Sequence, residues 1–346
     1  MIKKEWMAQG YIDEPVAADI DLQKEIRRLC QEKDAIILAH YYTVGEIQEV
    51  ADFVGDSLAL ARKAAETDAR MMVMCGVHFM AETCKLLSPG KVVLCPDLNA
   101  GCSLADSCKA DDLRRYKEEH PGYKVVSYVN TTAAVKALTD VVVTSGNAKR
   151  VIDSFPQDEK LIFGPDYNLG NYINAVTGRQ MLLWQGGCHV HERFSVEKIV
   201  ALKQQYPEAV VMAHLECKAP VLAIADVKGS TADMLRFAQQ NDATQFIVAT
   251  EAGILHELQR TCPEKTFIPV PPEFTESDAA QASHPSPLTH HPSPITSCGC
   301  NECQYMKMNT LQKIYNTLRY EWPQVEIDPT IAREAVKPIY RMLELS

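Results

Sequence analysis

The stretch Ala35-Ile36-Ile37-Leu38-Ala39-His40 is an apolar run that ends on a polar side chain. Two later stretches share this design, namely Lys124-Val125-Val126-Ser127-Tyr128-Val129-Asn130 and Ala209-Val210-Val211-Met212-Ala213-His214. Apolar runs of this length predict strands that are buried on both faces, as in a parallel sheet. Further strand-like runs alternate with helix-like segments until about residue 270. We therefore expect an α/β fold of three similar αβα units with parallel sheets.

Each predicted unit ends with a cysteine in a loop. Cys102 and Cys188 both follow an apolar, strand-like run, and they are 86 residues apart. Cys188 and Cys303 are 115 residues apart, and the difference of 29 residues equals the length of the segment Pro269–Ser297. That segment is rich in proline and histidine and shows no periodicity. We interpret it as an insertion in the third unit, either a passive linker or a lid.

The pattern divides the chain into five segments. They are an N-terminal lead-in with one amphipathic helix, three αβα units and a C-terminal helical segment, at residues 1–34, 35–107, 108–192, 193–304 and 305–346. The last segment opens with a helix-like run from Tyr305 to Tyr320. Ligands of open parallel sheets bind beyond the carboxyl ends of the strands, so three such ends facing one another would enclose a site.

The composition excludes several classes of protein. A formal charge of −10 and a pI near 5.5 argue against a nucleic-acid partner, which normally meets a basic surface. No apolar run approaches the ~20 residues of a membrane helix, so we expect no membrane partner. The N-terminal residues contain no apolar signal-peptide core, which predicts a cytoplasmic protein. The 12 cysteines are then expected to be reduced thiols rather than disulfides.

The densest cysteine motif is Cys298-x-Cys300-x-x-Cys303. Thiolates at this spacing suit a soft metal or a redox pair. A zinc site normally needs a second two-ligand motif, which the chain lacks. A dithiol switch is a second interpretation. In a third, the motif contributes to an iron–sulfur cluster together with Cys102 and Cys188, and three ligands would leave one iron open to substrate.

Histidines and a carboxylate lie at or just beyond the ends of these strands. His40 and His214 take the same place in the first and third units, and Glu216 lies on the same face of an extended chain as His214. With His191, which follows Cys188 by three residues, they favour an acid–base set beside a metal. A structural role is the alternative for any single histidine.

Small hydroxyl residues begin several of the predicted helices. The stretches are Gly55-Asp56-Ser57-Leu58, Asn130-Thr131-Thr132-Ala133, Thr144-Ser145-Gly146-Asn147 and Gly229-Ser230-Thr231-Ala232-Asp233. Each of them alone is typical of a helix N-cap. Helix N-termini also attract anions, so several around one cavity would bind phosphate or carboxylate groups without a basic patch. As a set, they favour this second interpretation.

Seven motifs occur in order along the chain: Ala39-His40-Tyr41-Tyr42-Thr43, Gly76-Val77-His78-Phe79-Met80-Ala81-Glu82-Thr83, Tyr128-Val129-Asn130-Thr131, Trp184-Gln185-Gly186-Gly187-Cys188, His214-Leu215-Glu216-Cys217, Gly229-Ser230-Thr231 and Met306-Lys307-Met308-Asn309. Together they resemble the quinolinate synthase family, the iron–sulfur enzymes of NAD biosynthesis, from about Asp21 to the end of the chain. The resemblance implies three αβα units around a pseudo-threefold axis, with the active site at their common interface.

The resemblance also implies a cofactor and a reaction. One [4Fe–4S] cluster takes one cysteine from each unit, which at the matching positions means Cys102, Cys188 and Cys303. Its open iron acts as a Lewis acid. The implied reaction condenses iminoaspartate with dihydroxyacetone phosphate to quinolinate, with loss of phosphate and two waters. An aspartate oxidase is the implied partner that supplies iminoaspartate.

Site residues follow from the same matching. The residues that match contacts to carboxylates and to the intermediate are His40, Tyr42, Ser57, Tyr128 and Asn130. Those that match a phosphate cradle are Ser145, His214, Ser230 and Thr231, and those that match a proton-transfer set are Glu216, His191 and Tyr42. The chain departs from the family at Gln304, where proline is common, and in its Pro/His-rich insertion. The alternative is a zinc-stabilised phosphometabolite-binding protein without catalysis.

Overall fold

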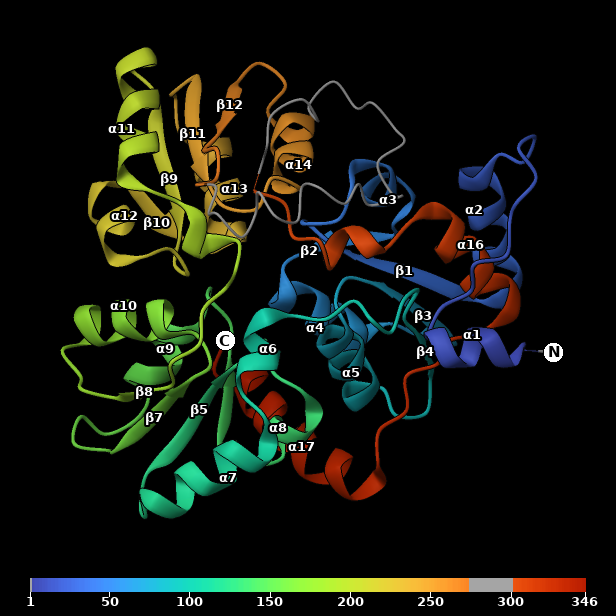
Figure 1. Cartoon of the computed structure of the whole chain (residues 1–346), viewed down its shortest axis with the longest axis horizontal. Helices are drawn as coiled ribbons and strands as arrows, with labels where there is room; N and C mark the ends of the chain where they lie inside the picture. The colour runs from blue at the N-terminus through green and yellow to red at the C-terminus, as the bar shows by residue number, and fades with distance from the viewer. Residues whose placement is uncertain (1, 274–300) are drawn as a thin grey trace. The chain divides into compact units, whose positions relative to one another are not determined.

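The computed structural model describes residues 2–273 and 301–346, and within them three four-stranded parallel sheets are formed (Figure 1). The strand orders are β2-β1-β3-β4, β6-β5-β7-β8 and β10-β9-β11-β12. One topology therefore occurs three times, which confirms the expected α/β fold of three similar αβα units. The strands are β1 (Ala35–His40), β2 (Phe53–Gly55), β3 (Met71–Cys75), β4 (Val92–Leu94), β5 (Lys124–Tyr128), β6 (Val141–Val143), β7 (Leu161–Gly164), β8 (Leu182–Leu183), β9 (Val210–His214), β10 (Val227–Gly229), β11 (Gln245–Ala249) and β12 (Thr266–Pro269).

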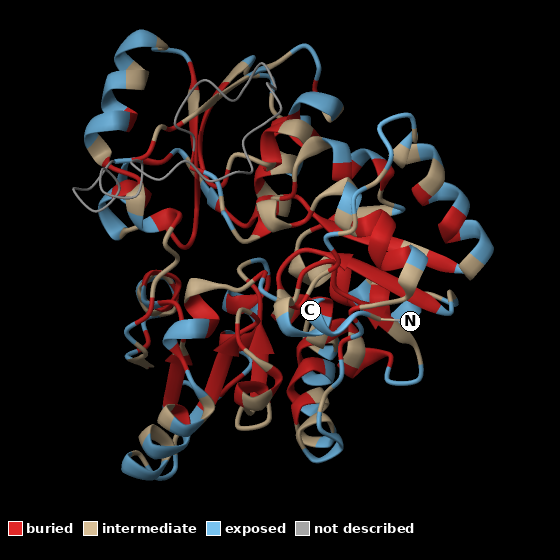
Figure 2. Ribbon diagram, turned by 45° about the vertical axis from the view of Figure 1, so that its right-hand side comes forward, coloured by how far each residue is buried: buried red, intermediate tan, exposed pale blue. Residues whose placement is uncertain are grey.

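Helices connect the strands. They are α1 (Lys4–Gln9), α2 (Leu22–Lys33), α3 (Gly45–Val50), α4 (Ser57–Glu66), α5 (His78–Leu87), α6 (Ser103–Ser107), α7 (Ala110–Glu119), α8 (Ala133–Lys136), α9 (Ala148–Asp153), α10 (Tyr167–Thr177), α11 (Val196–Gln205), α12 (Ala219–Ile224), α13 (Thr231–Gln240), α14 (Ile254–Thr261), α16 (Leu311–Tyr320) and α17 (Pro329–Glu344), with short 3-10 turns η1 (His191–Arg193) and η2 (Met306–Met308). Figure 2 shows that buried residues are concentrated in the central strands of the sheets, whereas the edge strands β8 and β12 contain none, and most helices have both buried and exposed residues. This is the burial expected where helices cover a parallel sheet.

An acidic side chain repeats at the same edge of each sheet. Asp52, Asp140 and Asp226 directly precede β2, β6 and β10. Each carboxylate accepts a hydrogen bond from a backbone N–H of the neighbouring first strand, 15 residues earlier in the chain. The three donors are Ile37 (2.7 Å), Val125 (2.8 Å) and Val211 (2.8 Å). The units thus share an atomic contact as well as a topology.

The chain forms two compact units. The larger unit, Met1–Cys188 with Cys303–Ser346, contains the first and second sheets, and the smaller unit, His189–Glu302, contains the third. Within the larger unit, α16 packs on α2, and α17 packs on α5, α8 and β6. The C-terminal helices therefore complete the core of the first two sheets. The five-segment division made from the sequence remains a prediction.

The N-terminal lead-in has more structure than the single helix expected from its sequence. Besides α2 it contains α1, in which Trp6 is 2% exposed. The indole N–H of Trp6 donates to Asp13 (3.0 Å), and its ring packs against Tyr320 of α16, with centroids 5.0 Å apart. Trp6 and the fully buried Ile12 thus help to anchor this segment, Trp6 through a partner more than 300 residues away in the sequence.

The helix-like run from Tyr305 to Tyr320 is also interrupted. It consists of η2 and α16, because Asn309 has an extended backbone and Thr310 caps α16. The side-chain amide of Asn309 donates to the carbonyls of Gly76 (2.9 Å) and Met306 (3.1 Å). A side chain that bonds backbone groups in this way competes with helical hydrogen bonding, so the helix starts again only after it.

Only the first part of the predicted insertion, residues 269–273, lies within the described residues. Pro269 ends β12, and the N–H of Val270 bonds to the carbonyl of Val248 (3.1 Å). The amide of Asn301 donates to the carbonyl of Val270 (3.3 Å). The chain therefore leaves and re-enters the described structure at one place. The remainder of Pro269–Ser297, together with Cys298 and Cys300, lies outside the described residues.

None of the helices in the described residues combines the length and the apolar character needed to cross a membrane.

Candidate active site

The turns after β1 and β9 hold their histidines in the same way. Nδ1 of His40 accepts a hydrogen bond from the backbone N–H of Tyr42 (3.1 Å), and Nδ1 of His214 accepts one from that of Glu216 (3.3 Å). A ring nitrogen that accepts carries no proton, so the neutral imidazole carries its proton on Nε2. His40 is 5% exposed and His214 is 3% exposed. Each turn therefore presents an Nε2–H donor suited to an anionic oxygen.

The repeat aligns the predicted site residues of the three units. The first strand of each sheet ends twelve residues before the repeated aspartate, at His40, Tyr128 and His214. Two residues beyond these are Tyr42, Asn130 and Glu216. Five residues after the aspartates are Ser57, Ser145 and Thr231. Most of the predicted catalytic and substrate-binding residues thus occupy three equivalent positions that recur in each of the three units, and only His191 and Ser230 fall outside this pattern.

In the smaller unit, His191 lies in contact with Glu216. Nδ1 of His191 lies 3.1 Å from a carboxylate oxygen of Glu216, and Nε2 lies 2.9 Å from the hydroxyl of Thr250. His191 is 1% exposed and Glu216 is 4% exposed. A buried carboxylate needs such partners, because burial alone disfavours its charge. With both ring nitrogens engaged, His191 fixes the orientation of Glu216. Tyr42, the third member of the predicted proton-transfer set, belongs to the larger unit.

His214 completes this cluster as a neutral side chain. Its ring stacks on His191, with centroids 4.7 Å apart. Burial lowers the pKa of His214 to about 4, although the nearby Glu216 carboxylate acts in the opposite direction. At neutral pH the imidazole is therefore uncharged and keeps the Nε2–H described above.

The hydroxyls at the helix starts differ in what they bind. Asp56 caps α4 by accepting from the N–H of Ala59 (2.9 Å), which leaves Ser57 half-buried at the first helical position. Ser230 itself caps α13, because its hydroxyl accepts from the N–H of Asp233 (3.2 Å) and donates to the carboxylate of that residue (2.7 Å). Ser230 is therefore the N-cap of α13. Thr231, not Ser230, is the positional equivalent of Ser57.

The ten described cysteines differ in exposure. Only Cys102, Cys188 and Cys303 are partly exposed, and the seven buried thiols are Cys30, Cys75, Cys84, Cys95, Cys108, Cys217 and Cys262. Burial raises the pKa to about 12 for four of these, Cys30, Cys84, Cys95 and Cys108, and also raises that of Cys75. Such thiols stay protonated and do not bind metals readily. The three predicted ligands are therefore distinguished by their environment.

The loops that carry the first two of these cysteines are in contact. The hydroxyl of Ser103, the neighbour of Cys102, donates to the carbonyl of Gly187, the neighbour of Cys188 (3.3 Å). A Cβ at Gly186 would lie 2.3 Å from the hydroxyl oxygen of Ser107. The glycine of this motif is therefore required for the close approach of its loop to α6.

The loop of the third cysteine joins the same region of the larger unit. A Cβ at Gly101 would lie 3.4 Å from the ring of Tyr305, two residues after Cys303. The ammonium of Lys307 donates to the carbonyl of Tyr42 (2.8 Å), which ties η2 to the turn after β1. The three cysteine loops are thus neighbours.

Asn130 faces the first cysteine. Its amide nitrogen lies 3.9 Å from the sulfur of Cys102, which is within reach of an N–H···S hydrogen bond. Its amide oxygen is shielded from solvent and has no hydrogen-bond partner among the described residues. Buried polar atoms are seldom left unsatisfied, so this oxygen marks a place for a donor from a ligand.

Comparisons with known proteins decide the family. The family model for the quinolinate synthetase A protein matches residues 24–344. The chain belongs to the quinolinate synthetase A family. The quinolinate synthase of Thermosynechococcus vestitus is 49% identical over 327 residues, which cover 94% of this chain and 96% of that protein. The quinolinate synthases of Rippkaea orientalis, 47% identical over 326 residues, and of Nostoc sp., 46% identical over 339, cover at least 94% of both chains.

As a member of the quinolinate synthetase A family, the protein is an enzyme of the quinolinate synthase kind. The structure adds residues to the region of the predicted site that the sequence interpretation left unassigned. Lys307 and Asn309 belong to a family-like motif, but their targets, the backbone carbonyls of Tyr42 and Gly76, are more than 200 residues away in the sequence. The carboxylate of Glu82 likewise accepts a hydrogen bond from the first N–H of α8 (2.9 Å). No local pattern indicates such contacts.

Proposed function

We propose that this enzyme condenses iminoaspartate with dihydroxyacetone phosphate and forms quinolinate, phosphate and two waters, in the de novo biosynthesis of NAD. The observation that carries the proposal is the selective exposure of Cys102, Cys188 and Cys303 on neighbouring loops, in a chain whose other described cysteines are buried. Membership of the quinolinate synthetase A family supports the same reaction.

The proposed cofactor is one [4Fe–4S] cluster held by Cys102, Cys188 and Cys303. Partly exposed thiols on loops that meet are the donor set that such a cluster requires, whereas buried protonated thiols are not. When bound, a cluster with three protein ligands supplies a Lewis-acid iron with an open coordination position. The half-buried Asn130, with its amide nitrogen near Cys102 and its unsatisfied amide oxygen, fits a contact to substrate beside this cofactor.

The substrates carry carboxylate and phosphate oxygens, and the three turns offer donors for them. We assign carboxylate and intermediate contacts to His40, Tyr42, Ser57, Tyr128 and Asn130, and phosphate contacts to Ser145, His214, Ser230 and Thr231. His40 and His214 can donate from Nε2. Ser57 and Thr231 lie at the first positions of ten-residue helices, where free backbone N–H groups favour anions. Neutral donors of this kind bind anions without a basic surface, which suits the net charge of −10.

Glu216 is the proposed proton-transfer residue. Its carboxylate is buried and bonded to His191, which in turn bonds to Thr250. In this series of hydrogen bonds, an oriented imidazole holds the carboxylate in place. A general acid or base contributes ~10²–10⁴-fold to the rate of a reaction. Tyr42 is the proposed second proton-transfer group, carried by the turn after β1.

Anaerobic purification tests the cofactor and the reaction together. We expect about four irons and four sulfides per chain and quinolinate formation only when both substrates are present. Cys102→Ser, Cys188→Ser and Cys303→Ser should each lose the iron and the activity, while Cys300→Ser and the buried control Cys262→Ser should keep both. A colourless zinc protein without activity would instead establish the phosphometabolite-binding alternative. Iron retained in Cys303→Ser but lost in Cys300→Ser would move the third ligand.

The proposed partner is an aspartate oxidase that supplies iminoaspartate in the cytoplasm. A coupled assay with aspartate, that oxidase and dihydroxyacetone phosphate should yield quinolinate, and omission of the oxidase should abolish it. Quinolinate formed at the same rate without the oxidase would show that the imine does not come from this source.

A further inference from the structure

Lys136 is the only buried lysine among the described residues, with no exposed surface. Its ammonium donates to the backbone carbonyls of Val129 (2.8 Å) and Thr131, and it lies 5.4 Å from the centre of the Phe79 ring. Burial lowers the pKa of Lys136 to about 8, while Glu82 and Cys102 act in the opposite direction. A buried ammonium is costly, so a lysine at such a position needs a reason.

The first unit contains the same arrangement with a different side chain. The side-chain amide of Gln48 donates to the carbonyls of Tyr41 and Thr43, both at 2.9 Å. Gln48 and Lys136 each lie eight residues after the end of the first strand of their sheet. In both units the accepting carbonyls belong to the first and third residues after that strand. In the third unit the equivalent residue is Leu222, which is buried and has no polar atom in its side chain.

The residue between the two accepting carbonyls is in each case a predicted site residue. Tyr42 lies between Tyr41 and Thr43, and Asn130 lies between Val129 and Thr131. Two hydrogen bonds to one donor group fix the peptide units on both sides of that residue, and thereby the direction of its side chain. In both turns the donor side chain is buried, so it reaches the carbonyls from inside the fold.

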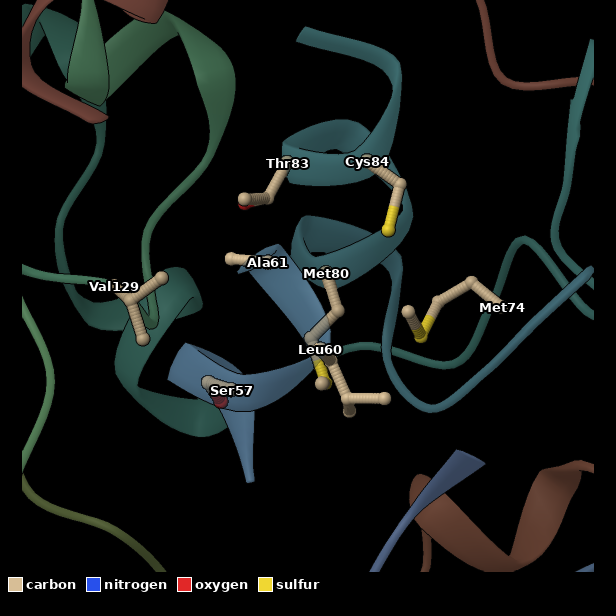
Figure 3. Close-up of a pocket in the computed structure, with 8 residues that line it drawn as sticks. All are labelled: Ser57, Leu60, Ala61, Met74, Met80, Thr83, Cys84 and Val129. Carbon is tan, nitrogen blue, oxygen red and sulfur yellow. The ribbon is translucent and has the colours of Figure 1, made fainter. Parts of the chain in front are cut away.

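A small cavity lies beside the second turn. Val129 lines a small cavity together with Ser57, Leu60 and Ala61 of α4, with Met80, Thr83 and Cys84 of α5, and with Met74 of β3 (Figure 3). The cavity measures about 10 Å³, roughly the space of one water molecule. A side chain beside a cavity has fewer contacts that resist movement. The bonds to Lys136 therefore matter more than they would in a close-packed turn.

We propose that Lys136 and Gln48 are positioning residues that hold the turns carrying Asn130 and Tyr42 in the geometry needed for substrate binding. The inference rests on the proposed function for the roles of those two site residues. According to this inference, the hydrogen bonds to the turn carbonyls hold the turn in place, and the charge of Lys136 is not required. The first unit supports this view, because the neutral amide of Gln48 makes the same pair of hydrogen bonds there.

The chain also supplies the variants that test it. Lys136→Leu and Gln48→Leu install the side chain that the third unit carries at this position, and they remove both bonds. Lys136→Gln and Gln48→Lys exchange the two natural donors. The matched control is Lys265→Leu, because Lys265 also donates to two carbonyls, those of Ala238 and Asn241 (both 2.6 Å), and lies 5.7 Å from the Phe246 ring. No predicted site residue lies between its acceptors.

Two measurements read the outcome. We expect Lys136→Leu to lower kcat/KM by roughly 100-fold, the effect of a misplaced binding group, and Lys136→Gln to restore it; Lys265→Leu should keep the wild-type value. Amide hydrogen exchange should rise in the peptide that spans residues 128–132 in Lys136→Leu and return towards wild type in Lys136→Gln. The same pattern is expected for residues 40–44 with Gln48→Leu and Gln48→Lys.

The two measurements separate failure of this inference from failure of the proposed function. A wild-type enzyme that forms no quinolinate would refute the proposed reaction, yet the exchange measurements would still test whether the donors hold the turns. Unchanged exchange in Lys136→Leu would overturn the positioning role. Exchange restored in Lys136→Gln without recovery of kcat/KM would also overturn it, because the charge would then be the property that matters.

Discussion

The turn after β1 and the turn after β9 share a backbone but are held by different side chains. In both, the N–H of the residue three beyond the histidine closes onto the histidine carbonyl, at 3.0 Å for Thr43 and 2.9 Å for Cys217. In the first turn, Gln48 then binds two carbonyls from within the core. In the turn after β9, the residue equivalent to Gln48 is Leu222. The site residue Glu216 is instead held by a contact between its own side chain and His191.

The difference follows from the chemistry of the residue each turn presents. Tyr42 is half-buried and uncharged at neutral pH, so fixing the backbone on either side is enough to aim it. Glu216 is a buried carboxylate, whose charge needs compensation as well as direction. The fold therefore anchors the main chain in the first case and the side chain in the second. Variants that remove one anchor or the other can separate the two designs.

The largest effect is expected at the anchored carboxylate. Glu216→Gln keeps the volume and a hydrogen bond to His191 but removes the titrating group. We expect turnover to fall by ~10²–10⁴-fold, with iron content and melting temperature nearly unchanged. Glu257→Gln is the matched control, because Glu257 is also buried but pairs with Arg260 (2.6 Å) away from this cluster. Normal turnover in Glu216→Gln would assign proton transfer to another residue.

The next effect concerns pH, and it comes from His214. Its folded-state pKa of about 4 lies below the ordinary value of 6.5. The unfolded chain therefore binds a proton first as the pH falls, so the stabilising contribution is complete above pH 6.5 and is lost between about 6.5 and 4. The loss amounts to about 3 kcal/mol. Urea unfolding at several pH values should show this slope in the wild type and a flatter one in His214→Gln; equal slopes would contradict the assignment.

A smaller effect is expected from the outer partner of the cluster. Thr250→Val removes the hydroxyl that binds Nε2 of His191 and leaves the shape of the side chain unchanged. A lost hydrogen bond of this kind corresponds to about a tenfold decrease in turnover, because the imidazole can then rotate away from Glu216. Thr250→Ser should recover most of the rate. If Thr250→Val is as active as the wild type, contacts with His214 are sufficient to hold the ring.

The smallest effect is expected from the chain between Val270 and Asn301. These residues are joined by a hydrogen bond of 3.3 Å, so a short Gly/Ser bridge in place of Glu273–Thr296 has little distance to span. Because loop-closure entropy changes by only about 0.6 kcal/mol per doubling of length, the free energy of unfolding should change by less than about 1 kcal/mol. A loss of substrate affinity with unchanged stability would contradict the linker interpretation.

The repeat itself was readable from local patterns, because continuous apolar strands and short polar loops depend on neighbouring residues only. When the three units are aligned on Asp52, Asp140 and Asp226, the equivalent site residues fall at the same offsets from these aspartates. The same alignment matches Gln48 with Lys136. That signal was present in the sequence but became recognisable only once the three backbone contacts were known.

Periodicity and spacing are local properties, so the sequence was enough to predict the α/β class, the three units and the residues that end the first strands, while the choice of Cys303 rested on the family resemblance. Only the tertiary structure decided which described thiols keep exposed surface, because burial depends on packing between distant segments. It also decided that Ser230 caps its helix and that His191 binds Thr250, 59 residues away. Lys136 is the clearest case: a lysine on a short helix predicts a solvated side chain, and only the fold places it under a turn with two carbonyls to satisfy.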